Sequence, residues 1–296
     1  MSRAMSHVMA VFVLVPIVAP TLGAGIVAVA PWRWVFWACV AYAAAVSLWT
    51  LRLPETLHEE YRLDARLARI VEAGRIVLSN RIAVGYGLAM TALYAVFISY
   101  LGSSEIIFGE VFGQDENFPY LFGALAAVMG GAMLINARIV RTIGTRRVAH
   151  TVLVAYLLAA AGFVAFALST DGRPSLLPFM AGLATLFAGH ALMIPNLNSI
   201  AMEPMARVAG TASSILGAAQ LGVGALLGSL IDRAFDGTIL PLALGFGGYG
   251  LAAFALVLWA EGGRLRLAGS RSGETAETAG ARHRGGRSRR EVAGPS

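Results

Sequence analysis

An all-α fold built from membrane-spanning helices is predicted by three features of this 296-residue chain. Hydrophobic residues make up 57% of it and charged residues only 14%, against roughly 25% charged in an average soluble domain. The apolar residues are gathered into runs near the ~20 residues that a helix needs to cross a bilayer. The arginines alternate between successive connections, as they do in multi-pass proteins. We therefore predict a polytopic transmembrane helical bundle.

Eight apolar runs contain no Asp, Glu or Arg, and each is predicted to be one membrane span. They cover residues 8–30, 34–51, 82–101, 119–137, 148–168, 174–202, 208–231 and 237–260. The first run is longer than the apolar core of a secretory signal peptide, and Pro16 and Pro20 interrupt it. We interpret it as a span and not as a cleaved leader.

The distribution of charge predicts the orientation of the chain. All 23 basic residues are arginines, and with a cytoplasmic N-terminus 20 of them lie on the cytoplasmic side, chiefly in the connections 52–81 and 138–147 and in the tail. The opposite side then holds Arg33, Arg173 and Arg233 alongside seven acidic residues. Because arginine is retained on the cytoplasmic side of a bilayer, we predict a bacterial inner-membrane protein with both termini cytoplasmic.

The long connection at 52–81 is predicted to contain an amphipathic helix. Its apolar residues fall at helical spacing, opposite a face that carries several arginines. Two interpretations stay open: a helix that lies on the anionic cytoplasmic leaflet, and a solvated linker helix that does not touch lipid. Either way the connection separates two predicted spans before it from six after it.

Several classes of site are disfavoured by composition. Cys39 is the only cysteine, so no disulfide framework or cysteine metal site is expected, and we expect no cofactor and no metal. The tail from 269 is rich in Gly, Ser and Arg, and we expect it to be disordered. Its Arg282–Arg290 cluster comes without an aromatic platform or a groove-reading helix, so nucleic acid is not an expected partner.

Two motifs carry helix-bending or turn residues. In the first span, Pro16-Ile-Val-Ala-Pro20-Thr-Leu-Gly23-Ala-Gly25 combines prolines, which bend a helix, with small residues, which let a neighbouring helix approach. Between the fourth and fifth spans runs Asn136-Ala-Arg138-Ile-Val-Arg141-Thr-Ile-Gly144-Thr-Arg146-Arg147. Gly144 permits a tight reversal, and the arginines are predicted to pair with carboxylates of adjacent helices.

Two further motifs lie near the end of the sixth span and in the seventh. Pro195 and Asn196 stand inside the apolar run 174–202, where a proline frees a carbonyl and an amide side chain must find a partner. After the span follow Arg207 and Gly210, and then a stretch of small residues that reaches Gln220 and Gly224. Small residues of this kind favour close helix packing.

Taken in order, these motifs resemble the bicyclomycin-resistance (Bcr/CflA) branch of the major facilitator superfamily over residues 1 to about 262. Leu53-Pro-Glu-Thr-Leu57, Gly102-Ser-Ser104 and Glu110-Val-Phe-Gly113 also match in order and spacing. The resemblance implies a major-facilitator-like bundle in which the eight spans correspond to helices 5–12 of twelve. It divides the chain into the last two helices of an N-terminal bundle (1–53), a cytoplasmic central loop (54–80), a six-helix C-terminal bundle (81–262) and a basic cytoplasmic tail (263–296).

The resemblance also implies a function. Members export small lipophilic drugs, such as bicyclomycin-like or chloramphenicol-like compounds, in exchange for protons by alternating access. The implied partners are such a drug, protons and the lipid bilayer, for a chain that is monomeric or needs the four helices that the alignment leaves out. The alternative is an inactive or partner-dependent transporter fragment. An enzyme is not expected, since the acids Glu105, Glu110, Asp115 and Glu116 come without a nearby His or a metal-ligand pattern.

The predicted site residues fall into two groups. Aromatic and sparse polar side chains suit lipophilic drugs, and the substrate-cavity candidates are Tyr94, Phe97, Tyr100, His190, Asn196 and Gln220. The conformational motif residues are Pro16, Pro20, Gly23, Gly25, Asn136, Arg138, Arg141, Gly144, Arg146, Arg147, Pro195, Arg207 and Gly210. Since no predicted span contains a carboxylate, His190 is the one titratable group expected deep in the membrane, either in proton coupling or in a helix–helix hydrogen bond.

Overall fold

The computed structural model describes residues 22–23, 25–54 and 67–267, and all regular secondary structure in these ranges is helical. The α-helices are α2 (Arg33–Thr50), α3 (Leu67–Ser79), α4 (Arg81–Ile106), α5 (Phe118–Ile143), α6 (Thr145–Ser169), α7 (Leu176–Met202), α8 (Ala209–Ala218), α9 (Gly224–Arg233) and α10 (Leu240–Ala260). A 3₁₀ segment, η3 (Glu203–Val208), joins α7 to α8. The π-helical turns η2 (Ile107–Val111) and η4 (Ala219–Val223) extend α4 and join α8 to α9. The predicted all-α class is confirmed.

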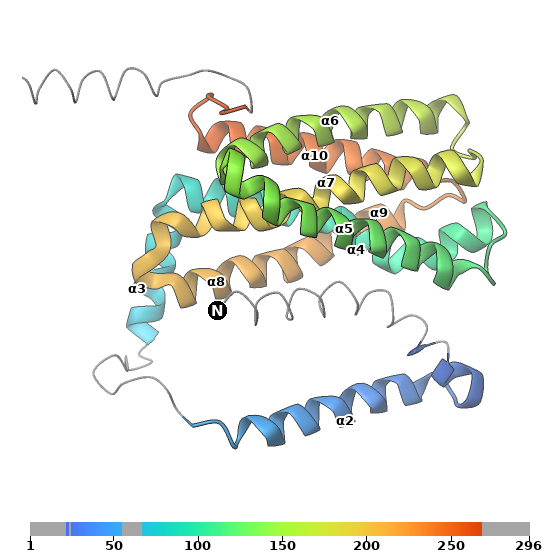
Figure 1. Cartoon of the computed structure of the whole chain (residues 1–296), viewed down its shortest axis with the longest axis horizontal. Helices are drawn as coiled ribbons and strands as arrows, with labels where there is room; N and C mark the ends of the chain where they lie inside the picture. The colour runs from blue at the N-terminus through green and yellow to red at the C-terminus, as the bar shows by residue number, and fades with distance from the viewer. Residues whose placement is uncertain (1–21, 24, 55–66, 268–296) are drawn as a thin grey trace, which may run out of the picture.

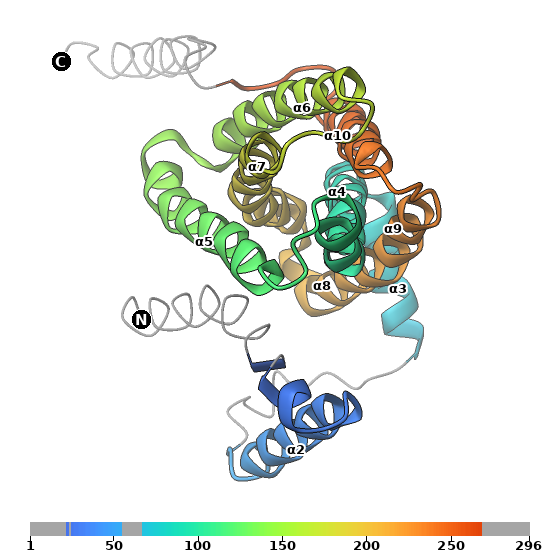
Figure 2. The ribbon, with the colours of Figure 1, turned by 90° about the vertical axis from the view of Figure 1, so that its right-hand side faces the viewer.

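The helices after α3 form an up-and-down bundle (Figure 1). Successive members α4, α5, α6, α7, the continuous pair α8–α9, and α10 run in alternating directions, and Figure 2 shows them end on. Each coincides with one of the six spans predicted after the central loop. The reversal between α5 and α6 takes the single residue Gly144, whose φ of 90° favours glycine.

Five helical stretches among the described residues are long and apolar enough to cross a membrane. One of them, Leu176–Arg233, is a 58-residue run that contains α7 and α8–α9, folded back on itself at η3 (Figure 1). It therefore holds two of the predicted spans. The predicted span 34–51 forms helix α2, which has 18 residues. It is not among the five stretches whose length and hydropathy suit a membrane span. A polytopic membrane protein is thus what the described helices indicate.

The core of the bundle lies around α4, the most deeply buried of the membrane helices. It packs against α10, α9 and α7. The largest fully buried side chains include Tyr86, Phe108, Phe179, Phe187 and Phe246. Glycines allow the closest helix approaches: a Cβ on Gly228 of α9 would lie 2.6 Å from the Ala95 carbonyl oxygen of α4.

The central loop contains the predicted helix, although it packs differently from the prediction. Ala73 and Val77 of α3 are buried, and Val77 clusters with Met205 and Ala212 of the bundle. Val71 and Leu78 stay exposed. Part of the apolar face of α3 therefore packs against the bundle, and part of it is exposed. Neither predicted interpretation, a helix bound to lipid alone or a linker without contacts, describes this arrangement.

Some sequence predictions fall outside the described residues. These are Pro16 and Pro20, most of the predicted span 8–30, residues 55–66 of the central loop, and the tail from 268. Helix α2 has no buried residue and lies apart from the bundle in both views (Figures 1 and 2).

Candidate functional site

A cavity of about 330 Å³ lies between α4, α5 and α7. Helix α7 packs against both α4 and α5. The lining residues are Tyr94, Phe97, Tyr100 and Leu101 from α4, Phe122, Leu125, Ala126, Met129, Gly130 and Met133 from α5, and Phe187, His190, Ala191, Ile194 and Pro195 from α7. None of them is charged. The cavity can therefore receive an apolar molecule without exposing it to an unpaired charge.

Aromatic rings form one wall of the cavity. Tyr94, Phe97 and Tyr100 recur every three residues along α4, which places them on one face of the helix. The Tyr100 ring packs edge-to-face on Phe187 of α7, with centroids 4.6 Å apart, and stacks on Phe122 of α5 at 5.8 Å. Such contacts hold the rings in place, so the wall is formed before any ligand arrives.

Two polar atoms on this wall have no partner. The Tyr100 hydroxyl and His190 Nδ1 are buried and make no hydrogen bond among the described residues. The His190 ring stacks on Phe97, with centroids 5.2 Å apart. No hydrogen bond to Nδ1 is present among the described residues, and both interpretations of His190, proton coupling and a helix–helix hydrogen bond, stay predictions.

The other two predicted cavity residues do not line it. Asn196 is buried one residue beyond Pro195, and its amide donates to Asn136 Oδ1 of α5 at 2.8 Å and to the Leu192 carbonyl at 2.6 Å. It therefore joins α5 to α7 and is not part of the cavity lining. Gln220 lies half-buried in η4, away from the lining residues.

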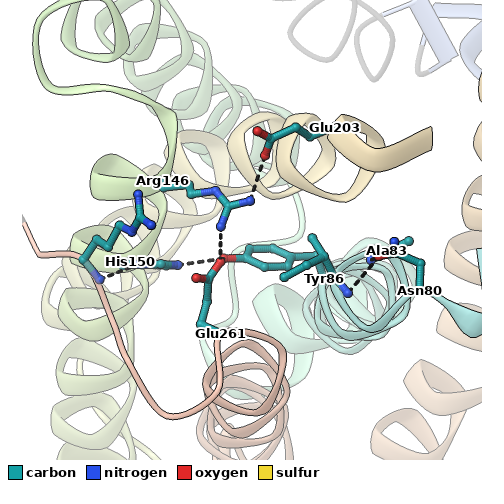
Figure 3. A network of polar contacts seen from close by, with 9 residues as sticks. Asn80, Ala83, Tyr86, Arg146, His150, Glu203 and Glu261 are labelled. Atoms are coloured by element: carbon teal, nitrogen blue, oxygen red, sulfur yellow. Dashed lines mark hydrogen bonds and ion pairs between the residues drawn. The ribbon is translucent and has the colours of Figure 1, made fainter. Parts of the chain in front are cut away.

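A network of polar contacts holds one end of the bundle together (Figure 3). Arg146, near the start of α6, pairs with Glu203 at the end of α7 at 2.8 Å and with Glu261, directly after α10, at 2.7 Å. The Glu261 side chain is 9% exposed and that of Glu203 is 64% exposed. Because solvent screens an exposed pair, the contact to Glu261 is the stronger one. The predicted pairing of this motif with carboxylates is confirmed for Arg146.

Tyr86 and His150 extend the network through a directed chain of hydrogen bonds. The backbone N–H of Arg266 donates to His150 Nδ1 at 2.9 Å, so this nitrogen carries no proton. The other nitrogen, Nε2, then donates to the Tyr86 oxygen at 2.7 Å, and the Tyr86 hydroxyl donates to Glu261 at 2.8 Å. The histidine is neutral in this arrangement, and both of its ring nitrogens and the Tyr86 hydroxyl have a hydrogen-bond partner (Figure 3).

Sequence reasoning did not assign this network. Tyr86 lies within a predicted span and Glu261 just beyond one, more than a hundred residues from Arg146, and no local pattern connects them. The available signal was His150, an imidazole at the end of an apolar run. The remaining motif arginines Arg138, Arg141 and Arg207 are exposed, and Arg147 is half-buried. Gly210 has open space beside it, as do Gly23 and Gly25.

The predicted spans contain no carboxylate, but the helices extend past the predicted span ends and carry acids there, Glu105 in α4 and Asp232 in α9. Ser99 of α4 is fully buried and donates a 2.5 Å hydrogen bond to Asp232, the penultimate residue of α9. The helix continues past the predicted end of the span at 231 and carries this acid into the α4–α9 contact. Sequence spans defined by the absence of charge necessarily stop short of such a residue.

Comparison with known proteins places these features in a family. The model of the Major Facilitator Superfamily matches residues 1–229. The chain is 26% identical over 250 residues to a bicyclomycin resistance protein homolog of Haemophilus influenzae, covering 83% of this chain and 62% of that protein. It is 24% identical over 236 residues to an uncharacterized MFS-type transporter, YdgK, of Bacillus subtilis, with coverages of 78% and 58%.

A third relative is the multidrug resistance protein MdtL of Escherichia fergusonii. The identity is 25% over 208 residues, which are 70% of this chain and 51% of that protein. The chain thus spans between 51% and 62% of the length of these three relatives. No solved structure matches it. The resemblance to the bicyclomycin-resistance branch is confirmed by the first relative, and the chain belongs to the Major Facilitator Superfamily.

Proposed function

We propose that the chain is the larger part of a multidrug efflux transporter, which exports small lipophilic drugs of the bicyclomycin or chloramphenicol kind across the bacterial inner membrane. The observation that carries this proposal is the aromatic cavity of about 330 Å³ between α4, α5 and α7, with no charged residue in its lining. The names of two relatives, bicyclomycin resistance protein homolog and multidrug resistance protein, support the same class of substrate.

Alternating access is the proposed mechanism, with the described bundle moving as one rigid half. The network around Arg146 supports this, because it ties the ends of α7 and α10 to the start of α6. Interactions that lock helices to one another within a half allow the movement to occur between halves. In this proposal the end that carries the network faces the cytoplasm, along with both termini.

Proton entry is the proposed driving force. The residues we propose for coupling are His190 on the cavity wall and Asp232, which accepts a hydrogen bond from the buried Ser99. His190 would couple proton and drug directly, because both would occupy one cavity. Asp232 would act through the α4–α9 contact.

A partner-dependent transporter half is the second candidate. The observation that favours it is an exposed apolar face on η4 and α9, where Leu221, Leu226 and Leu230 are each more than half exposed. A second set of helices could cover such a face, as lipid could. The chain's share of its relatives' length agrees with this candidate.

Drug accumulation tests both candidates. The chain is expressed in a bacterial strain deleted for its own multidrug pumps, and uptake of labelled chloramphenicol is followed with and without a protonophore. We expect cells that express the chain to accumulate less drug. The protonophore should abolish this decrease, and Phe97→Ala in the cavity should make it smaller. The matched control is Leu158→Ala, an exposed side chain of α6 that should leave accumulation unchanged.

Co-expression separates the candidates. If only cells that also contain the first four helices of a relative accumulate less drug, the partner-dependent half is correct. If neither arrangement lowers the accumulation of chloramphenicol or bicyclomycin, the efflux proposal is wrong.

A further inference from the structure

Four buried side-chain atoms among the described residues lack a hydrogen-bond partner, and two of them belong to the cavity. They are the Tyr100 hydroxyl and His190 Nδ1, on side chains of residues that are 2% and 4% exposed. The other two, Ser104 Oγ and the Tyr156 hydroxyl, belong to residues outside the lining. Buried polar groups are almost always paired in proteins, because an unpaired one forfeits the hydrogen bonds it made to water. Two of them on one cavity, whose other lining residues are apolar except for Tyr94, indicate a missing partner.

The two atoms are held within a single aromatic cluster. His190 stacks on Phe97 at 5.2 Å, Phe97 packs edge-to-face on Phe187 at 5.8 Å, and Phe187 packs on Tyr100 at 4.6 Å. Neither ring can turn away to find a partner elsewhere without breaking these contacts. Tyr100 and His190 both line the cavity, so a molecule that enters it packs beside these two side chains among mostly apolar ones.

We propose that Tyr100 and His190 select the ligand: the cavity takes an uncharged ring compound that carries a hydroxyl, carbonyl or amide group, which bonds to one or both of these side chains. A tyrosine hydroxyl donates and accepts, and a neutral imidazole nitrogen does either according to its tautomer, so groups of all three kinds find a match. A charged group does not fit, because no opposite charge lines the cavity. This inference deepens the proposed function and rests on the cavity being a ligand site.

Matched naphthalenes provide a direct test that needs no transport. The purified full chain in lipid nanodiscs is titrated with 1-naphthol, with 1-methylnaphthalene, which has the same shape without a hydrogen-bonding group, and with the anion 1-naphthoate. We expect the wild-type chain to bind 1-naphthol most tightly and 1-naphthoate most weakly. Tyr100→Phe and His190→Phe should each lower the preference for naphthol over methylnaphthalene roughly fivefold, as the loss of one hydrogen bond requires.

Tyr156→Phe is the matched control, because it also removes a buried, unpartnered hydroxyl but lies outside the cavity lining. It should leave the preference unchanged. For each variant, the ratio of the dissociation constants of 1-naphthol and 1-methylnaphthalene is compared with the wild-type ratio. This comparison cancels the partition of the probes into lipid and any general loss of binding.

The outcomes separate this inference from the proposed function. If the wild-type chain binds naphthol and methylnaphthalene equally well, or if both cavity variants keep the wild-type ratio, the selecting role of Tyr100 and His190 is wrong while the lipophilic cavity stands. If the wild-type chain binds none of the three probes, the cavity is not a ligand site and the proposed function fails with it.

Discussion

Arg146 connects three helix ends through one planar side chain. Its guanidinium reaches Glu203 through one nitrogen and Glu261 through the other, a geometry that lysine could not reproduce with a single ammonium group. Glu261 also accepts a hydrogen bond from Tyr86. The carboxylate is therefore buried with two partners, and both of them offset the free-energy cost of burying its negative charge.

Replacement of Arg146 by glutamine is expected to destabilise the bundle by about 3 kcal/mol, since it leaves the Glu261 carboxylate buried without a counter-charge. The measurement is unfolding of the purified chain by sodium dodecyl sulfate, followed by circular dichroism. Arg147→Gln is the control, because Arg147 makes no ion pair within the described residues. An equal loss of stability in both variants would show that the net positive charge matters and that the specific ion pairs of Arg146 do not.

Helices α4 and α9 approach each other so closely that their backbones are nearly in contact, and a glycine on α9 makes this possible. At Gly228 an added Cβ would meet the Ala95 carbonyl oxygen at 2.6 Å and the Ser99 nitrogen at 3.2 Å, both backbone atoms that cannot rotate away. The neighbouring Ser99–Asp232 hydrogen bond depends on the same approach. Small residues thus hold a membrane helix contact together where the hydrophobic effect gives little preference between protein and lipid.

Gly228→Ala is expected to destabilise the chain by about 1–3 kcal/mol, the usual range for forcing an extra carbon into a packed contact. Gly217→Ala, on the preceding α8, has no atom within 4 Å of the new carbon and should be neutral or slightly stabilising. Detergent-solubilised protein is heated and the fraction that stays monodisperse is measured for both variants. Equal midpoints for the two variants would mean that the α4–α9 contact is looser than described.

Charge divides the whole bundle into two unlike ends. The arginines at the end of α5 and the start of α6 lie at the same end as the network of Arg146. The opposite end carries Asp171 and four acids between the end of α4 and the start of α5, namely Glu105, Glu110, Asp115 and Glu116. By the retention of arginine in the cytoplasm, we predict that the first end faces inward.

Cysteine labelling tests this orientation. In a Cys39→Ser background, Arg141→Cys and Glu116→Cys each place one exposed thiol at opposite ends of α5. A membrane-impermeant maleimide added to intact spheroplasts should label position 116 and not position 141, and lysed membranes should label both. The reverse pattern in intact cells would invert the predicted topology.

The cavity illustrates how far sequence reasoning reaches at the level of a site. Tyr94, Phe97, Tyr100 and His190 were predicted together from residue type and do line one cavity, although their role in binding stays a prediction. Residue type alone does not distinguish Asn196, which lies outside the cavity lining, from these four residues. It lies about 100° around the helix from Pro195, which turns it to a different face, where Asn136 is its partner.

The sequence by itself determined the features that depend on local composition. Apolar runs of bilayer length predict helices, the arginine-rich connections predict their alternation, and Gly144 predicts a tight reversal, because each of these depends on residues close together in the sequence. Only the tertiary structure decided which polar groups meet. Arg146 with Glu261, and Ser99 with Asp232, are joined by the rotation and depth of helices distant in sequence, and that geometry is set by packing across the whole bundle.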